Sequence, residues 1–239
     1  FTMLHEGGHA RYGYNSNDQA VENGLWGGLG GAMHEGQARF YENIIGKSPE
    51  FWGLAYPVAQ KYFPYLKNVP MEKFYMALMQ VKPSLQRITA DELTYSLHPI
   101  IRFEMEKDWF DGKTKTDDFE EIWRAKYQET FGLAPKGARE GVLQDIHWAS
   151  GHVGYFQSYT LGNLYDGQLL HAMKKTLPDF DSLVAKGDFA PINQWLYDNV
   201  HQYGRAMSPK ETLEKATGEA LTEQYFLDYL REKYLVKLK

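Results

Sequence analysis

Helix-boundary signals recur along the sequence and constrain its fold more than any other feature. In the marked segments, start or stop signals flank apolar residues that recur at spacings of three and four, which is the period of an α-helix. The segments are 48–63, 89–98, 116–132, 208–218 and 222–235. Apart from short ambiguous runs, we find no alternating strand pattern, and there is no internal repeat. The sequence therefore predicts an all-α fold, with residues 1–239 as one domain.

Several helix starts can be assigned to single residues. Ser48 and Ser208 are expected N-caps, and each is followed by a proline at the first helical position. Thr89 and Glu92 have the spacing of a capping box. Pro99 should then kink or end the helix that they open.

The stretch "GLWGGLGGAM" at 24–33 is rich in glycine. Its glycine spacing loosely resembles a dinucleotide-binding loop, but such a loop follows a strand and no strand is predicted here. We therefore interpret it as a flexible connector between two helices.

The pentapeptide "HEGGH" at residues 5–9 is the clearest functional motif. On a helix, His5 and His9 lie on one face and can place two imidazole nitrogens on a single zinc ion. Glu6 is turned by about 100° from His5, where it can hold a metal-bound water without ligating the metal. The alternative, two solvated histidines on a polar helix, remains open for so short a motif.

A catalytic zinc site needs a third protein ligand. The chain has no cysteine, so that ligand is a histidine or a carboxylate. The candidates are His34, Glu35, Glu42, Asp18 and Glu22, and spacing alone does not choose among them.

Charge and hydropathy exclude other classes of function. The formal net charge of −5 argues against binding to nucleic acid or to an anionic membrane. No apolar run has the length of a membrane span. These features predict a cytoplasmic protein.

"HEGGHA" and "HEGQARFYEN" together resemble the carboxypeptidase Taq family of metallocarboxypeptidases, in which HExxHA precedes a second, HES-Q-type motif. Three further stretches resemble that family in the same order: "RITADELTYSLH" at 87–98, "GVLQDIHW" at 141–148 and "GYFQSYTLGN" at 154–163. The similarity extends over nearly the whole chain, and "GVLQDIHW" is its most diagnostic part.

The resemblance implies a helical zincin in which two halves enclose a deep groove. It implies that His5, His9 and Glu35 bind the metal, which is zinc or sometimes cobalt. Glu6 would be the general base in the removal of single residues from the C-termini of peptides. The substrates would be peptides with a free C-terminus.

By the same resemblance, Tyr155 would stabilise the oxyanion and His147 would assist at the substrate carbonyl or backbone. Tyr155 and Tyr159 are four residues apart on a helix face, so aromatic core is the alternative role for Tyr155 and the expected one for Tyr159. Arg87 would bind the C-terminal carboxylate of the substrate. Arg102, which we expect on the same helix as Arg87, is the alternative candidate for binding this carboxylate.

Members of this family are about twice as long as this chain, which matches their C-terminal catalytic half. We therefore expect an N-terminally truncated product, a partial reading frame or a chain that works with a separate partner. An exposed apolar face would favour a homodimer or association with a missing N-terminal half.

Two other functions remain open from the sequence. The first is a helical zinc endopeptidase or oligopeptidase, which would share the metal site but lack an arginine for the carboxylate. The second is a catalytically silent fragment that retains the metal site.

Overall fold

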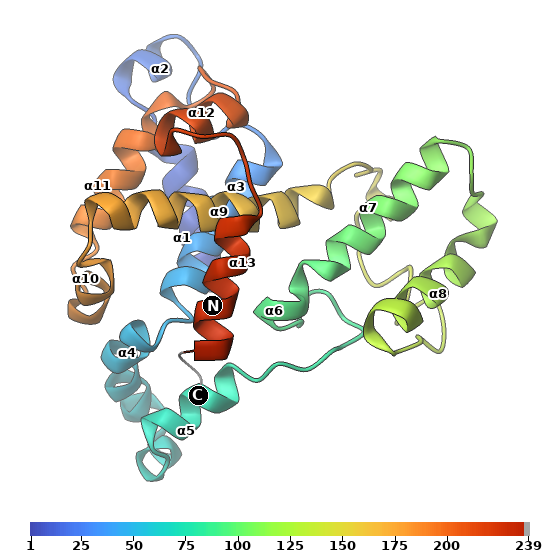
Figure 1. Cartoon of the computed structure of the whole chain (residues 1–239), viewed down its shortest axis with the longest axis horizontal. Helices are drawn as coiled ribbons and strands as arrows, with labels where there is room; N and C mark the ends of the chain where they lie inside the picture. The colour runs from blue at the N-terminus through green and yellow to red at the C-terminus, as the bar shows by residue number, and fades with distance from the viewer. Residues whose placement is uncertain (237–239) are drawn as a thin grey trace. The chain divides into compact units, whose positions relative to one another are not determined.

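The computed structural model describes residues 1–236, and all regular structure in that range is helical (Figure 1). This confirms the predicted all-α fold. The chain divides into two compact units. Unit 1 combines residues 1–79 with the part of the chain from Leu161 onward, and unit 2 is Gln80–Thr160.

Unit 1 contains α-helices together with short 3₁₀ and π elements, which are labelled η. In chain order its elements are α1 (Thr2–Tyr14), α2 (Asp18–Glu22), α3 (Gly31–Arg39), η1 (Phe40–Ile45), α4 (Pro49–Tyr62), η2 (Pro64–Asn68), α5 (Met71–Leu78), most of α9 (Gln157–Thr176), α10 (Phe180–Lys186), α11 (Ala190–Asn199), η5 (His201–Tyr203), α12 (Pro209–Thr217), α13 (Gln224–Arg231) and η6 (Glu232–Val236).

Two apolar clusters form the core of unit 1. The larger one joins η1, α9, α10 and α11, and includes Phe40, Met173 and Ile192, none of which is exposed. The other joins α1 and α3 to α9 through Tyr12, Met33 and Leu169. Burial of such side chains contributes about 1.5–3 kcal/mol each, so α9 is the helix on which unit 1 is assembled.

Unit 2 is smaller and is built on two helices. Its elements are α6 (Glu92–Tyr95), α7 (Leu97–Phe110), η3 (Thr116–Asp118), α8 (Phe119–Phe131), η4 (Trp148–Ser150) and the first residues of α9. Ile101 and Met105 of α7 pack against Trp123 and Tyr127 of α8. The last two rings are stacked with centroids 4.9 Å apart.

Two predicted helix starts are confirmed. The Ser48 hydroxyl accepts a hydrogen bond from the Phe51 amide at 3.1 Å, so Ser48 caps α4. Ser208 and Glu211 form a reciprocal capping box at the start of α12. In both cases a side chain satisfies a backbone N–H that the first helical turn leaves without an intrahelical partner.

The predicted capping box of Thr89 and Glu92 is wrong. Asp91 is the cap, because its carboxylate accepts a hydrogen bond from the Thr94 amide at 2.9 Å. The short helix α6 ends at Tyr95, and α7 begins two residues later. Pro99 explains this break, because its ring would clash with the carbonyl of Tyr95 in a continuous helix.

Glycines in the connector between α2 and α3 have left-handed backbone angles. Gly24, Gly27 and Gly30 have φ of +69°, +81° and +72°, and α3 begins at Gly31. Residues with a Cβ rarely adopt these angles, which explains why the stretch is rich in glycine.

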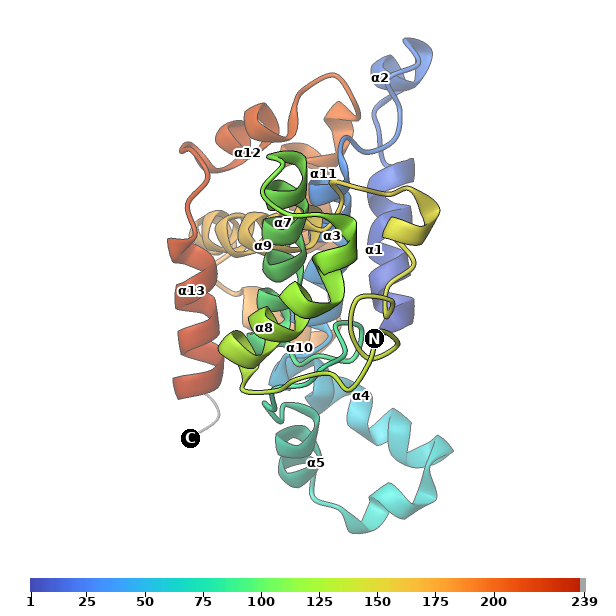
Figure 2. The same ribbon diagram turned by 90° about the vertical axis from the view of Figure 1, so that its right-hand side faces the viewer.

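Helices α1 and α3 lie side by side in both views of the chain (Figures 1 and 2). Gly8 of α1 is buried at their contact. A Cβ atom at this position would lie 2.5 Å from the Gln37 carbonyl oxygen and 2.6 Å from the Ala38 Cα. The two backbones can approach this closely only because residue 8 has no side chain.

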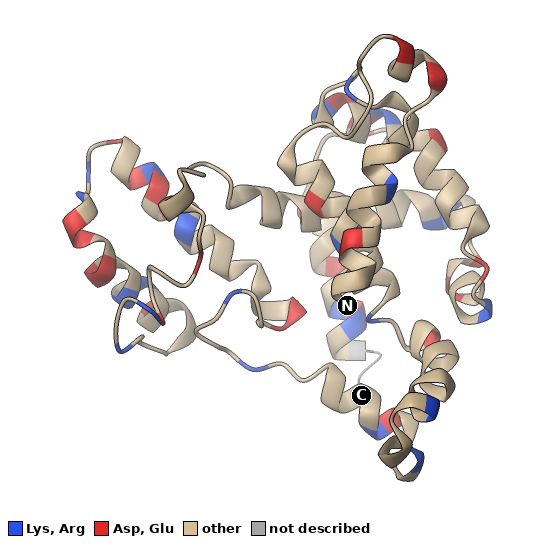
Figure 3. Cartoon of the chain, turned by 180° about the vertical axis from the view of Figure 1, so that it is seen from behind, with Lys and Arg blue, Asp and Glu red and all other residues tan. Residues whose placement is uncertain are grey.

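Charged side chains are interspersed along the helices of both units, with Lys and Arg beside Asp and Glu (Figure 3). Within residues 1–236, no helix combines the length and the apolar composition that crossing a membrane requires.

We predict that Gly8→Ala destabilises unit 1 by about 1–3 kcal/mol, because the added methyl group meets backbone atoms that cannot rotate away. The matched control is Gly7→Ala, since a Cβ at Gly7 meets nothing within 4 Å. This second change should be neutral or stabilise by up to about 1 kcal/mol, the gain of alanine over glycine in a helix. Urea unfolding of the metal-free variants measures both effects, and equal stabilities would contradict the close contact.

Candidate metal centre and the arginine network

The two histidines of "HEGGH" lie on one face of α1, as their spacing predicts. The ring centroids of His5 and His9 are 4.8 Å apart, and both side chains are half-buried. Glu6 follows His5 on the same helix and is exposed.

Glu35 of α3 completes a group of three possible metal ligands. Its Oε2 atom is 3.8 Å from His5 Nε2, and its Oε1 atom is 3.8 Å from His9 Nε2. One ligand atom from each of the three residues lies within 4.8 Å of the others. Glu35 is 5% exposed, so α3 presents a buried carboxylate to the half-buried pair.

The other candidates for a third ligand lie elsewhere. The ring of His34 packs against Tyr12, with centroids 4.8 Å apart, and does not join the group. Asp18 and Glu22 are exposed on α2.

Glu42 of η1 contacts the opposite edge of the His5 ring. Its Oε2 atom is 2.9 Å from His5 Nδ1. Lys47 and Arg39 are also near this carboxylate, with Lys47 Nζ 3.5 Å from Oε1 and Arg39 Nη1 3.8 Å from Oε2. Glu42 therefore binds the histidine from the side that does not face Glu35.

The protonation of these groups suits metal binding. Burial lowers the pKa of His9, although Glu35 opposes the shift. Burial would raise the pKa of Glu42, but the hydrogen bond with His5 and the charges of Arg39 and Lys47 outweigh it and lower that pKa to about 2. A neutral imidazole and an ionised carboxylate are the forms that bind metals or orient their ligands.

Two imidazole nitrogens and one carboxylate are a donor set known from catalytic zinc sites. Zinc binds such atoms at about 2.0–2.2 Å, so separations of 3.8 Å leave room for one ion between them. The residues of α1 and α3 therefore fit a metal ion.

Arg87 of unit 2 is held by hydrogen bonds from all three of its guanidinium nitrogens. Nε and Nη2 donate to the Asp145 carboxylate at 3.0 and 2.8 Å, and Nη1 donates to the Tyr95 hydroxyl at 2.9 Å. Its guanidinium carbon lies 4.5 Å from the centroid of the Tyr159 ring.

Arg102 binds the same carboxylate through its other oxygen. Its Nε donates to Asp145 Oδ2 at 2.7 Å, and its side chain is fully buried above the Trp123 ring. The expectation that Arg87 and Arg102 share a helix is wrong. Arg87 lies in a bend before α6, whereas Arg102 belongs to α7.

His147 and Tyr155 lie on the segment that leads into α9, as expected. Their ring centroids are 5.7 Å apart, and His147 Nε2 is 3.0 Å from the Tyr159 hydroxyl. Burial lowers the pKa of His147, and the charge of Arg87 lowers it further. Tyr159 is half-buried, and its ring packs against those of Tyr95 and His147.

Asp145 is the residue of this network that the sequence reasoning missed. It lies inside "GVLQDIHW", the motif that is most diagnostic of the family resemblance. Arg87 is 58 positions away in the sequence, and no local pattern connects the two residues.

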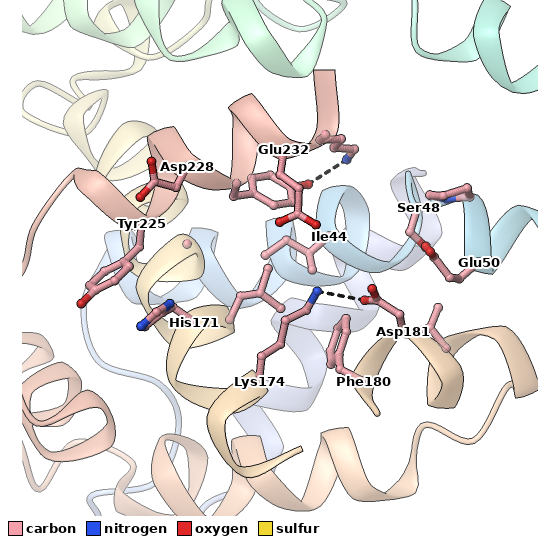
Figure 4. A pocket seen from close by; sticks show the side chains of 16 residues that line it. Ile44, Ser48, Glu50, His171, Lys174, Phe180, Asp181, Tyr225, Asp228 and Glu232 are labelled. Carbon is pink, nitrogen blue, oxygen red and sulfur yellow. Dashed lines mark hydrogen bonds and ion pairs between the residues drawn. The ribbon is translucent and has the colours of Figure 1, made fainter. Parts of the chain in front are cut away.

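Unit 1 also contains a pocket (Figure 4). It has a volume of about 210 Å³ and lies among α9, α10, α13 and the start of α4. Phe180 contributes to its apolar wall, and an ion pair between Lys174 and Asp181, 2.9 Å long, lies beside that ring. The predicted site residues do not line this pocket.

Comparison with known proteins matches nearly the whole chain to one family. The model of the family described as carboxypeptidase Taq (M32) metallopeptidase matches residues 1–234. Carboxypeptidase 1 of Bacillus subtilis is 43% identical over 235 residues, which are 98% of this chain and 47% of that protein. Thermostable carboxypeptidase 1 of Pyrococcus furiosus is 40% identical over 234 residues, with the same coverage.

A solved structure agrees with these relatives. The M32 carboxypeptidase from Deinococcus radiodurans R1 matches with a TM-score of 0.94 and 40% identity, over 98% of this chain and 48% of that one. The chain thus spans about half the length of the curated relatives it matches.

We predict that Asp145→Asn lowers the free energy of unfolding of unit 2 by on the order of 3 kcal/mol, because two buried guanidinium groups lose their carboxylate. Asp111→Asn is the matched control, since Asp111 is an exposed ion-pair partner in the same unit. It should change stability much less. Urea unfolding followed by tryptophan fluorescence compares the two variants, and similar losses would contradict the network.

The effect of Asp145→Asn should also depend on pH. Burial raises the pKa of Asp145, but Arg102 and Arg87 outweigh it and hold that pKa below its ordinary value. A carboxylate with a depressed pKa stabilises the fold above its unfolded pKa of about 3.9 and loses this contribution as pH falls. The difference in stability between wild type and variant should therefore shrink below about pH 4.

Proposed function

The chain belongs to the carboxypeptidase Taq (M32) family of metallopeptidases, and on this premise we propose that it carries the metal site and general base of a zinc-dependent carboxypeptidase. Such an enzyme removes single residues from the C-termini of peptides. The observation that carries the proposal is the convergence of His5 Nε2, His9 Nε2 and the Glu35 carboxylate.

In the proposed mechanism His5, His9 and Glu35 hold the metal. A zinc ion held there would supply Lewis acidity, which lowers the pKa of water to about 7 and polarises a carbonyl group. Glu6 takes the proton of the attacking water and later gives it to the leaving amine. The same donors also accept Co²⁺, so cobalt is the alternative metal.

Residues of unit 2 have the chemistry for the remaining roles. The Tyr155 hydroxyl can donate to the developing oxyanion, with His147 assisting at the substrate carbonyl or backbone. Arg87 can bind the free C-terminal carboxylate, because a guanidinium group matches that shape and charge. These roles are proposed from the family resemblance and from the residue types.

We expect Glu6→Gln to lower the hydrolysis rate by about 10²–10⁴-fold, because the general base is lost. Zinc binding should stay at the wild-type level, since Glu6 is not a ligand in this proposal. The zinc content of each purified protein tests the expectation about the metal. The rate at which single residues are released from a peptide with a free C-terminus measures the loss of activity. If the wild type and the variant both bind zinc but neither hydrolyses the peptide, the chain is instead a catalytically silent metal-binding module.

We expect wild type to prefer a peptide with a free C-terminus over its C-terminally amidated twin, and Arg87→Lys to weaken this preference. Loss of a charged hydrogen bond of about 1.5–3 kcal/mol should raise KM for the free peptide by about 10–100-fold. Arg124→Lys is the matched control, because Arg124 is an exposed arginine of α8 that pairs with Glu120, and it should leave this preference unchanged. A wild type indifferent to amidation would indicate an endopeptidase or oligopeptidase.

A further inference from the structure

His5 is held at both edges of its ring. Its Nε2 atom faces Glu35, whereas its Nδ1 atom lies 2.9 Å from Glu42 Oε2. His9 differs, because the backbone of His34 interacts with its ring and opposes the lowering of its pKa by burial. A carboxylate side chain thus contacts the His5 ring on the edge that does not face Glu35.

The contact with Glu42 determines where His5 carries its proton. Lys47 and Arg39 lie within 4 Å of the Glu42 carboxylate and favour its ionised form. An ionised carboxylate only accepts hydrogen bonds, so Nδ1 must be the donor. The lone pair of a neutral His5 is then on Nε2, the nitrogen that faces Glu35 and His9.

Glu42 is anchored to the core through its neighbours in the chain. It belongs to the π-helix η1, whose neighbouring residues Phe40, Tyr41, Ile44 and Ile45 are buried. The carbonyl of the next residue, Asn43, accepts a hydrogen bond from Lys233 Nζ at 3.0 Å. The carboxylate therefore lies on a rigid element that packs directly against α1.

We infer that Glu42 is a positioning residue of the metal centre, which holds the His5 ring and its proton so that Nε2 is free to bind the ion. This inference rests on the proposed function, because it treats His5 as a ligand. Carboxylates that orient a metal-bound histidine typically account for about 10–100-fold in metal affinity.

The first test measures zinc affinity by competition with a coloured chelator. Glu42→Leu removes the acceptor at similar volume and should weaken binding by about 10–100-fold. Glu42→Gln keeps a neutral acceptor and should lie between this variant and wild type. Glu22→Gln, which alters an exposed carboxylate of α2, should bind zinc as wild type does.

A second measurement separates positioning from a general loss of structure. Long-range proton–nitrogen NMR spectra of the metal-free protein, labelled with ¹⁵N in histidine, show which ring nitrogen carries the proton. In wild type the proton of His5 should be on Nδ1, and in Glu42→Leu it should move largely to Nε2. The spectrum of His9 should stay unchanged. An unchanged His5 proton together with wild-type affinity would overturn the inference.

Ligand variants separate this inference from the proposed function. His9→Ala and Glu35→Gln should each weaken zinc binding strongly. If neither does, the ligand set is wrong and the role of Glu42 falls with it. If both do, but Glu42→Leu binds zinc as tightly as wild type, only the positioning role is overturned.

Discussion

The contact between α1 and α3 at Gly8 is the constraint on which the candidate metal centre depends. The absence of a side chain at this residue lets the backbones of the two helices nearly touch. His5 and His9 flank Gly8 on α1, and Glu35 lies two residues before Gln37 on α3. A wider separation of the helices would move the carboxylate out of reach of both imidazoles, so one glycine links helix packing to the chemistry of the site.

Burial and charge set the protonation states of the residues on the two sides of this centre in different ways. On the side of the candidate ligands, burial lowers the pKa of His9 and so favours the neutral imidazole, which is the form that coordinates a metal. On the far side, Glu42 is surrounded by His5, Arg39 and Lys47 and is held ionised. The same fold therefore favours the neutral form of His9 and the ionised form of Glu42.

Local features of both the fold and the site could be predicted from the sequence. A helical repeat alone places His5 beside His9, and capping chemistry alone places the starts of α4 and α12. Glu35 could not be chosen by spacing, because its position depends on the packing of α3 against α1. The family resemblance selected it, and the structure places its carboxylate beside the two histidines.

The arginine network of unit 2 could not be predicted from the sequence. Asp145 binds Arg87 with one oxygen and Arg102 with the other, and both partners are distant in the sequence. Burying three charges has a large desolvation cost, so the network is weak evidence for stability and stronger evidence for a need for fixed geometry. Arg102 is fully enclosed, whereas Arg87 is 8% exposed. Arg102 and Asp145 thus hold the guanidinium group of Arg87 in one orientation, through the carboxylate that the two arginines share.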